Sequence, residues 1–336
     1  MKRQGRLIDD IVCMGNLQLA FYKAQKGKAA RPEVEAYAQQ LQSNLKELQR
    51  RIVSGDVETG NYHYFTVYDP KKRVICAAPF SQRVLHHALM NICHASFDRY
   101  QIDQSFASRS GKGTYAALDL AKRYHRRYGW FLKLDVRKYF ESIDHAILKQ
   151  QLSRLFKDRH LLMIFEKIID SHASAVSGRG LPIGNLTSQY FANHYLSHLD
   201  HWIKEVLHVP AYVRYMDDMV LWSNDRGRLL ESGQRLQQDA SEDLRLVLKP
   251  FCFNRSRKGL PFLGYLLFPD HVRLSRRSRT RFITKSGIFA EQLLSGQWTQ
   301  KEYAQHVMPL ESFTDYADSR DLRKSVYRRI ELTYTI

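Results

Sequence analysis

The segment Ala211–Trp222 limits the possible folds of this chain more than any other part of its sequence. It consists of two apolar runs that meet at two adjacent carboxylates, Asp217 and Asp218. The aliphatic and aromatic residues on both sides favour strands, and the aspartates fall where the chain must turn, so we predict a β-hairpin with both carboxylates at its tip. Because like charges this close repel each other, they are best explained by a cation held between them and a third ligand.

A second acidic motif favours this cation over the alternative, which is a simple polar turn. Asp9 and Asp10 are also adjacent, so an Asp-Asp pair alone does not decide the matter. Upstream of the hairpin, however, the apolar strand predicted over Phe131–Leu134 ends at Asp135 and is followed by aromatic residues. A carboxylate at this strand end, beside the hairpin, would complete a three-aspartate site for two Mg²⁺ ions about 3.5–4 Å apart.

The charge of the chain points to a polyanionic partner. Its 336 residues include 52 Lys and Arg against 34 Asp and Glu, which gives a net charge of +18. Nucleic acid is the first candidate and a membrane surface the second. No apolar run approaches the roughly 20 residues of a spanning helix, and the start of the chain does not lead into a signal-peptide core. We therefore expect a cytoplasmic protein without a membrane partner.

Together, the two acidic motifs resemble the palm of a reverse transcriptase. Tyr215–Asp218 is a form of that family's Tyr-x-Asp-Asp box, and Asp135 with Phe140 five residues later matches its first catalytic motif. The resemblance implies that Asp135, Asp217 and Asp218 are the catalytic residues and that they hold two Mg²⁺ ions, which Mn²⁺ can replace.

Two residues after Asp135 acquire expected roles from the same resemblance. The backbone at Val136 would lie against the triphosphate and next to a metal ion. The Phe140 ring would lie under the sugar, where it excludes a ribose 2'-hydroxyl and so selects deoxynucleotides. An ordinary core phenylalanine is the alternative for Phe140.

Two further segments resemble the fingers motifs of the family. After Asp69-Pro70 we expect a turn and a basic strand, in which Arg73, with Lys72 as a second candidate, would bind the triphosphate of the incoming nucleotide. The Gly-rich basic turn Ser105–Thr114 opens a predicted helix, an arrangement that binds phosphate, and Arg109 in it would be the second triphosphate contact. The alternative for each single cation is a solvated surface residue.

The segment Leu181–Gln189 resembles one subclass of reverse transcriptases. Most members of the family have Gln before the glycine and Pro after the serine of this motif, whereas this chain has Ile183 before Gly184 and Gln189 after Ser188. The pattern is similar to that of diversity-generating retroelements, which copy a template-repeat RNA while misincorporating opposite adenine. A branched hydrocarbon at position 183 makes only shape contacts, which discriminate less than an amide does. Gly184 would allow close approach of the backbone to the base pair, and Gln189 would lie at the same nucleotide site.

The resemblance also implies the partners. They are the template-repeat RNA, the RNA/cDNA duplex, deoxynucleoside triphosphates, and an oligomeric accessory variability-determinant protein, in a bacterial, archaeal or phage-encoded system. An alternative with the same chemistry is a free-standing group II intron-like or phage-defence reverse transcriptase. Ile183 and Gln189 argue against this alternative. An alternative from another class is a catalytically idle, basic RNA-binding scaffold, against which the three aspartates argue.

The C-terminal third is expected to complete the polymerase. Leu229–Leu248 has a helical pattern, and Lys249 is the best match to a lysine that lies near the triphosphate in the family, although neighbouring basic residues offer competing registers. Phe262–Leu267 is strand-like and resembles the primer grip. The arginines that follow lead into three predicted helices, around Phe289–Leu294, Lys301–Met308 and Asp321–Ile330, which would bind the template-primer duplex as a small thumb.

Three histidines raise one more alternative. His194, His198 and His201 share a helical face at spacings of four and three residues, which resembles a zinc site. Sequence-local spacing is a poor indicator of a metal, and the family that the chain resembles uses no such zinc. We interpret them as structural histidines.

The sequence therefore predicts an α+β fold of the right-hand polymerase type. N-terminal helices and fingers would occupy residues 1–128, and the palm, an antiparallel sheet plus helices, residues 129–268, with returning fingers elements around 155–180. A small helical thumb would occupy residues 269–336.

Overall fold

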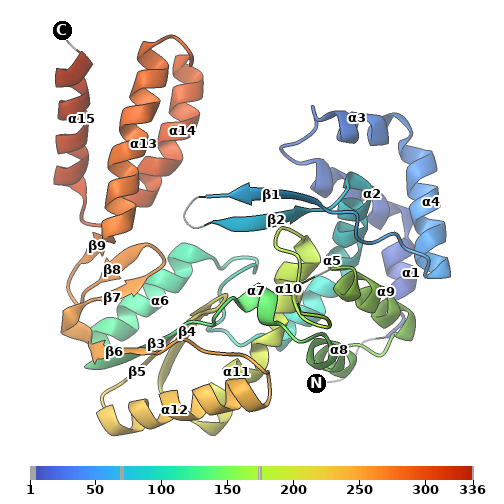
Figure 1. Cartoon of the computed structure of the whole chain (residues 1–336), viewed down its shortest axis with the longest axis horizontal. Coiled ribbons are helices and arrows are strands. Elements are labelled where there is room, and N and C mark those ends of the chain that lie inside the picture. Colours follow the sequence, from blue (N-terminus) through green and yellow to red (C-terminus); the bar gives the residue numbers. More distant parts are fainter. Residues whose placement is uncertain (1–4, 69–71, 173, 175, 335–336) are drawn as a thin grey trace.

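The computed structural model describes residues 5–68, 72–172, 174 and 176–334. Its N-terminal part is helical, as predicted, and packs around one long helix (Figure 1). The helices of this part are α1 (Leu7–Val12), α2 (Met14–Gln25), α3 (Pro32–Gln39), α4 (Leu41–Ser54) and the long α5 (Phe80–Tyr100). Leu17 and Phe21 of α2 and Val84 and Leu89 of α5 are buried in one continuous core. Removal of these side chains from water is the main force that holds the short helices in place.

A two-stranded hairpin interrupts the helices. Strands β1 (His63–Val67) and β2 (Arg73–Ala77) pair antiparallel, with Tyr64 opposite Cys76. The turn expected at Asp69-Pro70 lies outside the described residues. The hairpin extends from the N-terminal helices towards the C-terminal ones (Figure 1).

A four-stranded antiparallel sheet forms the centre of the molecule. Its strands are β3 (Trp130–Leu134), β4 (Ala211–Tyr215), β5 (Asp218–Ser223) and β6 (Cys252–Arg255), in the spatial order β4-β5-β3-β6. The predicted hairpin is present as β4 and β5, and Tyr215 and Asp218 are its last pair. Because β3 lies next to β5, with Leu134 opposite Met219, the end of β3 is brought to the hairpin tip.

Helices cover both faces of this sheet, which explains why its strands read as nearly continuous apolar runs. Phe131, Val220 and Trp222 share one buried cluster with helix α6 (Thr114–Arg127). Leu132 and Leu221, on the opposite face, belong to the main core together with helix α12 (Arg226–Glu242). The remaining helices of this region are α7 (Tyr139–Ser142), α8 (His145–Leu155), α9 (Arg159–Asp170), α10 (Leu186–Tyr195), α11 (Ser197–His201) and a π-helical turn, Trp202–Val206.

A small sheet and three helices complete the described chain. The sheet consists of β7 (Leu260–Phe262), β8 (Tyr265–Leu267) and β9 (Val272–Leu274), and it leads into α13 (Arg276–Leu294), α14 (Gln300–Asp315) and α15 (Arg320–Tyr334), with a short 3-10 turn, Ser256–Lys258, between β6 and β7. The three helices stand to one side of the central sheet, opposite the N-terminal helices (Figure 1). Within the residues described, no helix is both long and apolar enough to cross a bilayer.

The structure corrects three predicted elements. The segment Phe262–Leu267 is a hairpin and not one strand, because Leu263 and Gly264 both have positive φ and reverse the chain. Helix α12 ends at Glu242, and the predicted remainder up to Leu248 is a turn and an irregular segment, with Arg245 at a φ of +52° and Leu248 bridged to Val136. The first arginines after β9 lie within α13 itself instead of leading into a helix near Phe289.

Candidate active site

The three predicted aspartates converge at one end of the central sheet. Asp217 lies in the turn between β4 and β5, Asp218 begins β5, and Asp135 directly follows the adjacent strand β3. Burial, together with the negative charges of Asp135 and Asp218, raises the pKa of the Asp217 carboxyl. Asp217 therefore lies close enough to both other carboxylates for their charges to act on it.

Two lysines compensate part of this charge. The ammonium Nζ of Lys249 lies 2.8 Å from Oδ2 of Asp135, and Nζ of Lys133 lies 2.9 Å from Oδ1 of Asp218. Among the competing registers, the structure thus brings Lys249 to the site, and its N–H also donates to the Asp135 carbonyl. Lys133 is not among the site residues predicted from the sequence. Side chains two residues apart on a strand lie on the same face, so its place beside Asp135 could have been predicted.

The donor set fits a hard divalent cation. Oδ1 of Asp135 is buried and has no hydrogen-bond partner in the described structure, and the neighbouring Asp217 is half-buried. Mg²⁺ prefers carboxylate oxygens, and a buried acceptor without a donor is costly unless a ligand satisfies it. The role of the Val136 carbonyl as a further ligand stays a prediction; the two hydrogen bonds that flank its bridge to Leu248 are made by the backbone of Asp135 and Arg137.

A basic cavity of about 760 Å³ adjoins the segment that directly follows Asp135, since Arg137 and Lys138 line it. Lys72 and Arg73 of the β2 hairpin and Ile183 line it, so the structure brings these three predicted residues together. Four further cations line the same cavity: Arg137, Lys138, Arg179 and Arg245. Arg137 and Lys138 follow Asp135 in the sequence, but their side chains are not among the predicted nucleotide contacts. Arg179 and Arg245 carry no local signal, because distant segments bring them here.

Gly184 lies against the β2 strand, and its predicted approach to the base pair stays a prediction. Its φ is +124°, and a Cβ atom there would lie 3.0 Å from Cγ2 of Ile75 and 3.1 Å from the carbonyl oxygen of Cys76. The N–H of Cys76 in turn donates to the Ile183 carbonyl at 2.7 Å. Glycine is therefore needed to attach the fingers-like hairpin to the segment before α10.

The structure gives the positions of Phe140 and Gln189 but does not test whether they contact a nucleotide. Phe140 lies in α7, half-buried against the main core, and its neighbours Glu141 and Ser142 line the basic cavity. Gln189 is half-buried in α10. Their predicted nucleotide contacts stay predictions.

Arg109 is not available for a triphosphate in this structure, which corrects the prediction. Its side chain is 8% exposed, and Nε lies 2.7 Å from Oδ1 of Asp98. Nη1 donates to the carbonyls of Ile102 and Ser105 at 2.6 and 2.9 Å. The guanidinium thus organises the loop before α6.

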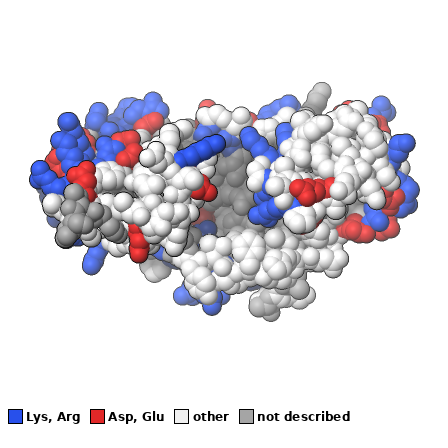
Figure 2. Space-filling model, turned by 90° about the horizontal axis from the view of Figure 1, so that it is seen from above, with Lys and Arg blue, Asp and Glu red and all other residues white. Residues whose placement is uncertain are grey.

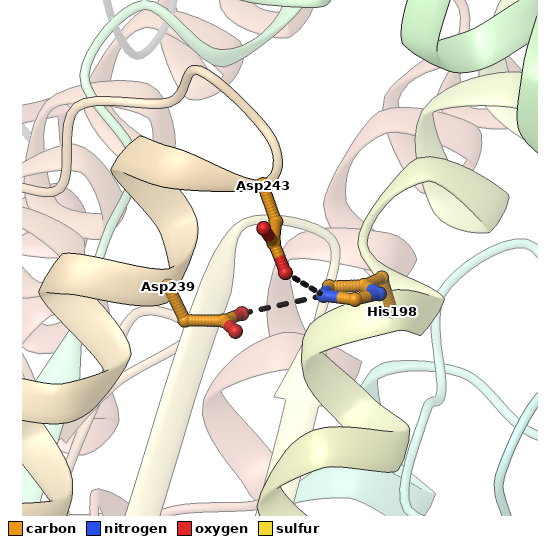
Figure 3. A group of neighbouring side chains, drawn as sticks. All are labelled: His198, Asp239 and Asp243. Carbon is orange, nitrogen blue, oxygen red and sulfur yellow. Dashed lines mark ion pairs between the residues drawn. The ribbon is translucent and has the colours of Figure 1, made fainter.

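The three histidines of α10 and α11 do not form one site. His194 is buried against Phe97 and Tyr100, and Nδ1 of His201 lies 2.6 Å from Glu205. His198 points to α12, where Nε2 lies 3.4 Å from Oδ2 of Asp239 and 3.2 Å from Oδ2 of Asp243 (Figure 3). The contact with Asp239, together with the charge of Asp243, raises the pKa of His198, so the ring acts here as the ion-pair partner of two carboxylates on another helix and does not join His194 and His201 in a metal site.

This ion pair predicts a pH-dependent stability. Because the folded pKa of His198 exceeds its ordinary value of 6.5, the stabilisation is fully present below that pH and is lost as the pH rises through the folded pKa. We expect His198→Gln to lower the denaturation midpoint at acidic pH and to have little effect at alkaline pH. Urea unfolding at both pH values measures this. In an Asp239→Asn background the pH-dependent difference should shrink, and an equal loss at both pH values would contradict the assignment.

A hollow separates the C-terminal helices from the N-terminal ones, and Lys and Arg side chains border it (Figure 2). Arg276, Arg277, Arg281 and Lys285 line a groove along α13, and Lys72 and Arg73 line the cavity beside β2. Such paired basic walls suit a nucleic-acid backbone.

These features define a class of protein. Three carboxylates at the end of an antiparallel sheet, a basic cavity next to the segment that follows Asp135 and a hollow bordered by cations form the site of a template-directed nucleic-acid polymerase with the right-hand fold. The family follows from a comparison with family models. Residues 68–267, more than half of the chain, match the model described as "Reverse transcriptase (RNA-dependent DNA polymerase)". The chain belongs to this family, whose domains use divalent metal ions and whose reaction is RNA-directed DNA synthesis.

Relatives and solved structures agree with this family. The chain is similar to the group II intron-encoded protein LtrA of Lactococcus lactis subsp. cremoris, with 23% identity over 141 residues, 40% of this chain and 24% of that protein. It is also similar to nuclear intron maturase 1 of Arabidopsis thaliana, with 26% identity over 87 residues, 26% of this chain and 12% of that protein. The chain thus spans no more than a quarter of the length of these relatives.

The fold is similar to that of telomerases. For apo telomerase from Candida tropicalis the TM-score is 0.51 at 10% identity, over 70% of this chain and 54% of that one. For telomerase from the same organism in complex with a TWJ fragment of telomeric RNA it is 0.50 at 10% identity, over 86% and 58%. The mixed α+β, right-hand polymerase fold predicted from the sequence is confirmed.

Proposed function

We propose that this protein is a reverse transcriptase that copies RNA into DNA with Asp135, Asp217 and Asp218 as its metal-binding residues. The observation that carries the proposal is the convergence of three carboxylates around a buried, unpartnered oxygen of Asp135. When bound, two Mg²⁺ or Mn²⁺ ions supply Lewis-acid activation of the primer 3'-hydroxyl and neutralise charge on the leaving pyrophosphate.

The side chains of the chain then have distinct tasks in nucleotide binding. Lys72 and Arg73 bind the triphosphate from the hairpin side of the cavity, and Arg137 and Lys138 add positive charge from the palm side. Lys249 lies close to the metal-binding end of the same site. Ile183 contributes a surface without hydrogen-bonding groups in its side chain.

The hollow holds the template and the growing duplex in this proposal. Helix α13 presents Arg276, Arg277, Arg281 and Lys285 along one groove, at spacings that follow the helical repeat. It would contact the backbone of the RNA/cDNA duplex, as expected of a thumb.

The subclass we propose is the reverse transcriptase of a diversity-generating retroelement. Its support is the replacement of Gln by Ile183 at the cavity and Gln189 after Ser188. The enzyme would copy a template-repeat RNA with adenine-directed errors in mutagenic retrohoming, together with an accessory variability-determinant oligomer, in the cytoplasm. The similarity to group II intron proteins favours a second candidate, a free-standing group II intron-like reverse transcriptase.

Primer extension tests the activity and the subclass together. Purified protein, an RNA template containing all four bases, Mg²⁺ and all four deoxynucleotides should yield cDNA, with errors concentrated opposite adenine. Faithful cDNA would retain the polymerase and reject the diversity-generating subclass. If no cDNA forms even with a cognate RNA and the accessory protein present, the result would favour the alternative of a non-catalytic RNA-binding scaffold.

Position 183 offers a sharper prediction. We expect Ile183→Gln to lower the error frequency opposite adenine about five- to tenfold, the value of one added hydrogen bond. The control is Val247→Gln, which places the same amide on a side chain that is 60% exposed and lines the same cavity. Sequencing of the cDNA measures both. Equal error spectra for the two variants would contradict the role of Ile183.

A further inference from the structure

A buried cation lies directly behind the catalytic turn. Arg214 belongs to β4, three residues before Asp217, and its side chain is completely buried. A buried guanidinium is strongly unfavourable unless all its donors are paired, so its partners show what the residue does.

Most of these partners fix the guanidinium itself. Its Nε and Nη2 atoms lie 2.7 and 2.6 Å from the two carboxylate oxygens of Asp200, which is also fully buried. Nη1 donates to the Asn193 side chain at 2.7 Å, and Nη2 donates to Gln101 at 3.1 Å. Asn193 lies in α10, Asp200 in α11, and Gln101 follows α5, so three elements hold one side chain.

The remaining donor reaches the catalytic turn. Nη1 of Arg214 donates to the carbonyl of Met216 at 3.1 Å. Met216 has a φ of +53°, in the left-handed region that residues other than glycine rarely adopt without support from their surroundings. Its carbonyl and the N–H of Asp217 belong to the same planar peptide group. Fixing this carbonyl therefore fixes the backbone of Asp217.

We propose that Arg214 is a positioning residue for the catalytic turn, which it ties to helices α10 and α11 through Asn193 and Asp200. The inference rests on the polymerase activity proposed above. Helix α10 directly follows Ile183 and Gly184, so the same network joins the segment at the nucleotide cavity to the backbone of Asp217.

Arg214→Lys tests the proposal because lysine keeps the charge but lacks the planar fork that serves Asp200 and Met216 at once. We expect the single-turnover rate to fall about 10- to 100-fold, as for a small misplacement of a catalytic group, while the KM for deoxynucleotide changes less than about twofold. The matched control is Tyr212→Phe. The Tyr212 hydroxyl donates at 2.8 Å to Oδ1 of Asp200, the oxygen that also accepts from Nε of Arg214, and Tyr212 lies two residues farther from the turn along β4. The Tyr212→Phe variant should have a lower melting temperature but nearly the wild-type single-turnover rate.

The rates, KM values and melting temperatures together separate the possibilities. A rate loss in Arg214→Lys well beyond that of Tyr212→Phe, at similar melting temperatures, supports the positioning role. Equal rate losses, or a raised KM with an unchanged rate, would overturn it. If Arg214→Lys does not fold, Asn193→Ala takes its place, since it removes the acceptor that orients Nη1, and an unchanged rate would overturn the proposal. Wild-type protein without any activity would instead reject the proposed function.

Discussion

Asp217→Asn is expected to abolish cDNA synthesis, with a rate at least about 10³-fold below wild type. Asn has nearly the same shape but lacks the negative charge that a Mg²⁺ ligand supplies at the centre of the site. The same change should raise the melting temperature in the absence of divalent ions. Burial and two neighbouring carboxylates raise the pKa of Asp217, so the ionised group is less favourable in the folded protein than in the unfolded chain, and its removal relieves that cost.

Primer extension and thermal denaturation in a chelator measure the two effects on the same sample. Asp103→Asn is the control, since this side chain is 93% exposed and belongs to the loop between α5 and α6, which carries none of the three aspartates. It should change neither quantity. Retained cDNA synthesis in Asp217→Asn would reject the metal site, and a lower melting temperature would reject the repulsion between the carboxylates.

Gly184→Ala is expected to lower kcat/KM for deoxynucleotides about 10²-fold. The added methyl group would meet Ile75 and the backbone carbonyl of Cys76 at 3.0–3.1 Å, at a φ of +124° that L residues rarely adopt. A backbone carbonyl cannot rotate out of the way as the end of a side chain can. The clash should therefore displace strand β2 as a whole and move Arg73 away from the cavity.

Gly15→Ala is the control for this substitution. Gly15 lies in α2, and a Cβ atom there would meet nothing within 4 Å. Alanine in a helix stabilises by about 0.5–1 kcal/mol over glycine, so this variant should be active and slightly more stable. Steady-state kinetics of both variants decide the matter, because an unchanged kcat/KM in Gly184→Ala would show that the hairpin tolerates displacement.

The sequence allowed the local parts of the site to be predicted, because each depends on a few neighbouring residues. Apolar runs that end at Asp135 and at Asp217-Asp218 determine the strands and the turn, and their adjacency follows from the family resemblance. Lys133 was predictable too, since alternation along a strand puts it on the face of Asp135.

The parts that failed depend on contacts between distant segments. Arg109 has the surroundings of a phosphate ligand in the sequence, but Asp98, eleven residues away, pairs with it in the fold. The network of Arg214, Asp200 and Asn193 joins residues whose types alone suggest ordinary polar positions. All three side chains are buried in the fold, and buried polar groups need hydrogen-bond partners. Only the packing therefore reveals that they must bond to one another.

The two lysine pairs at the site have a consequence for how the protein is made and handled. Lys133 and Lys249 already oppose the charges of Asp218 and Asp135, so the chain does not depend on dissolved ions to bring its aspartates together. We therefore expect a newly synthesised chain to fold without magnesium. Protein purified in EDTA should keep its shape and recover its function on dialysis, with the divalent ion added last.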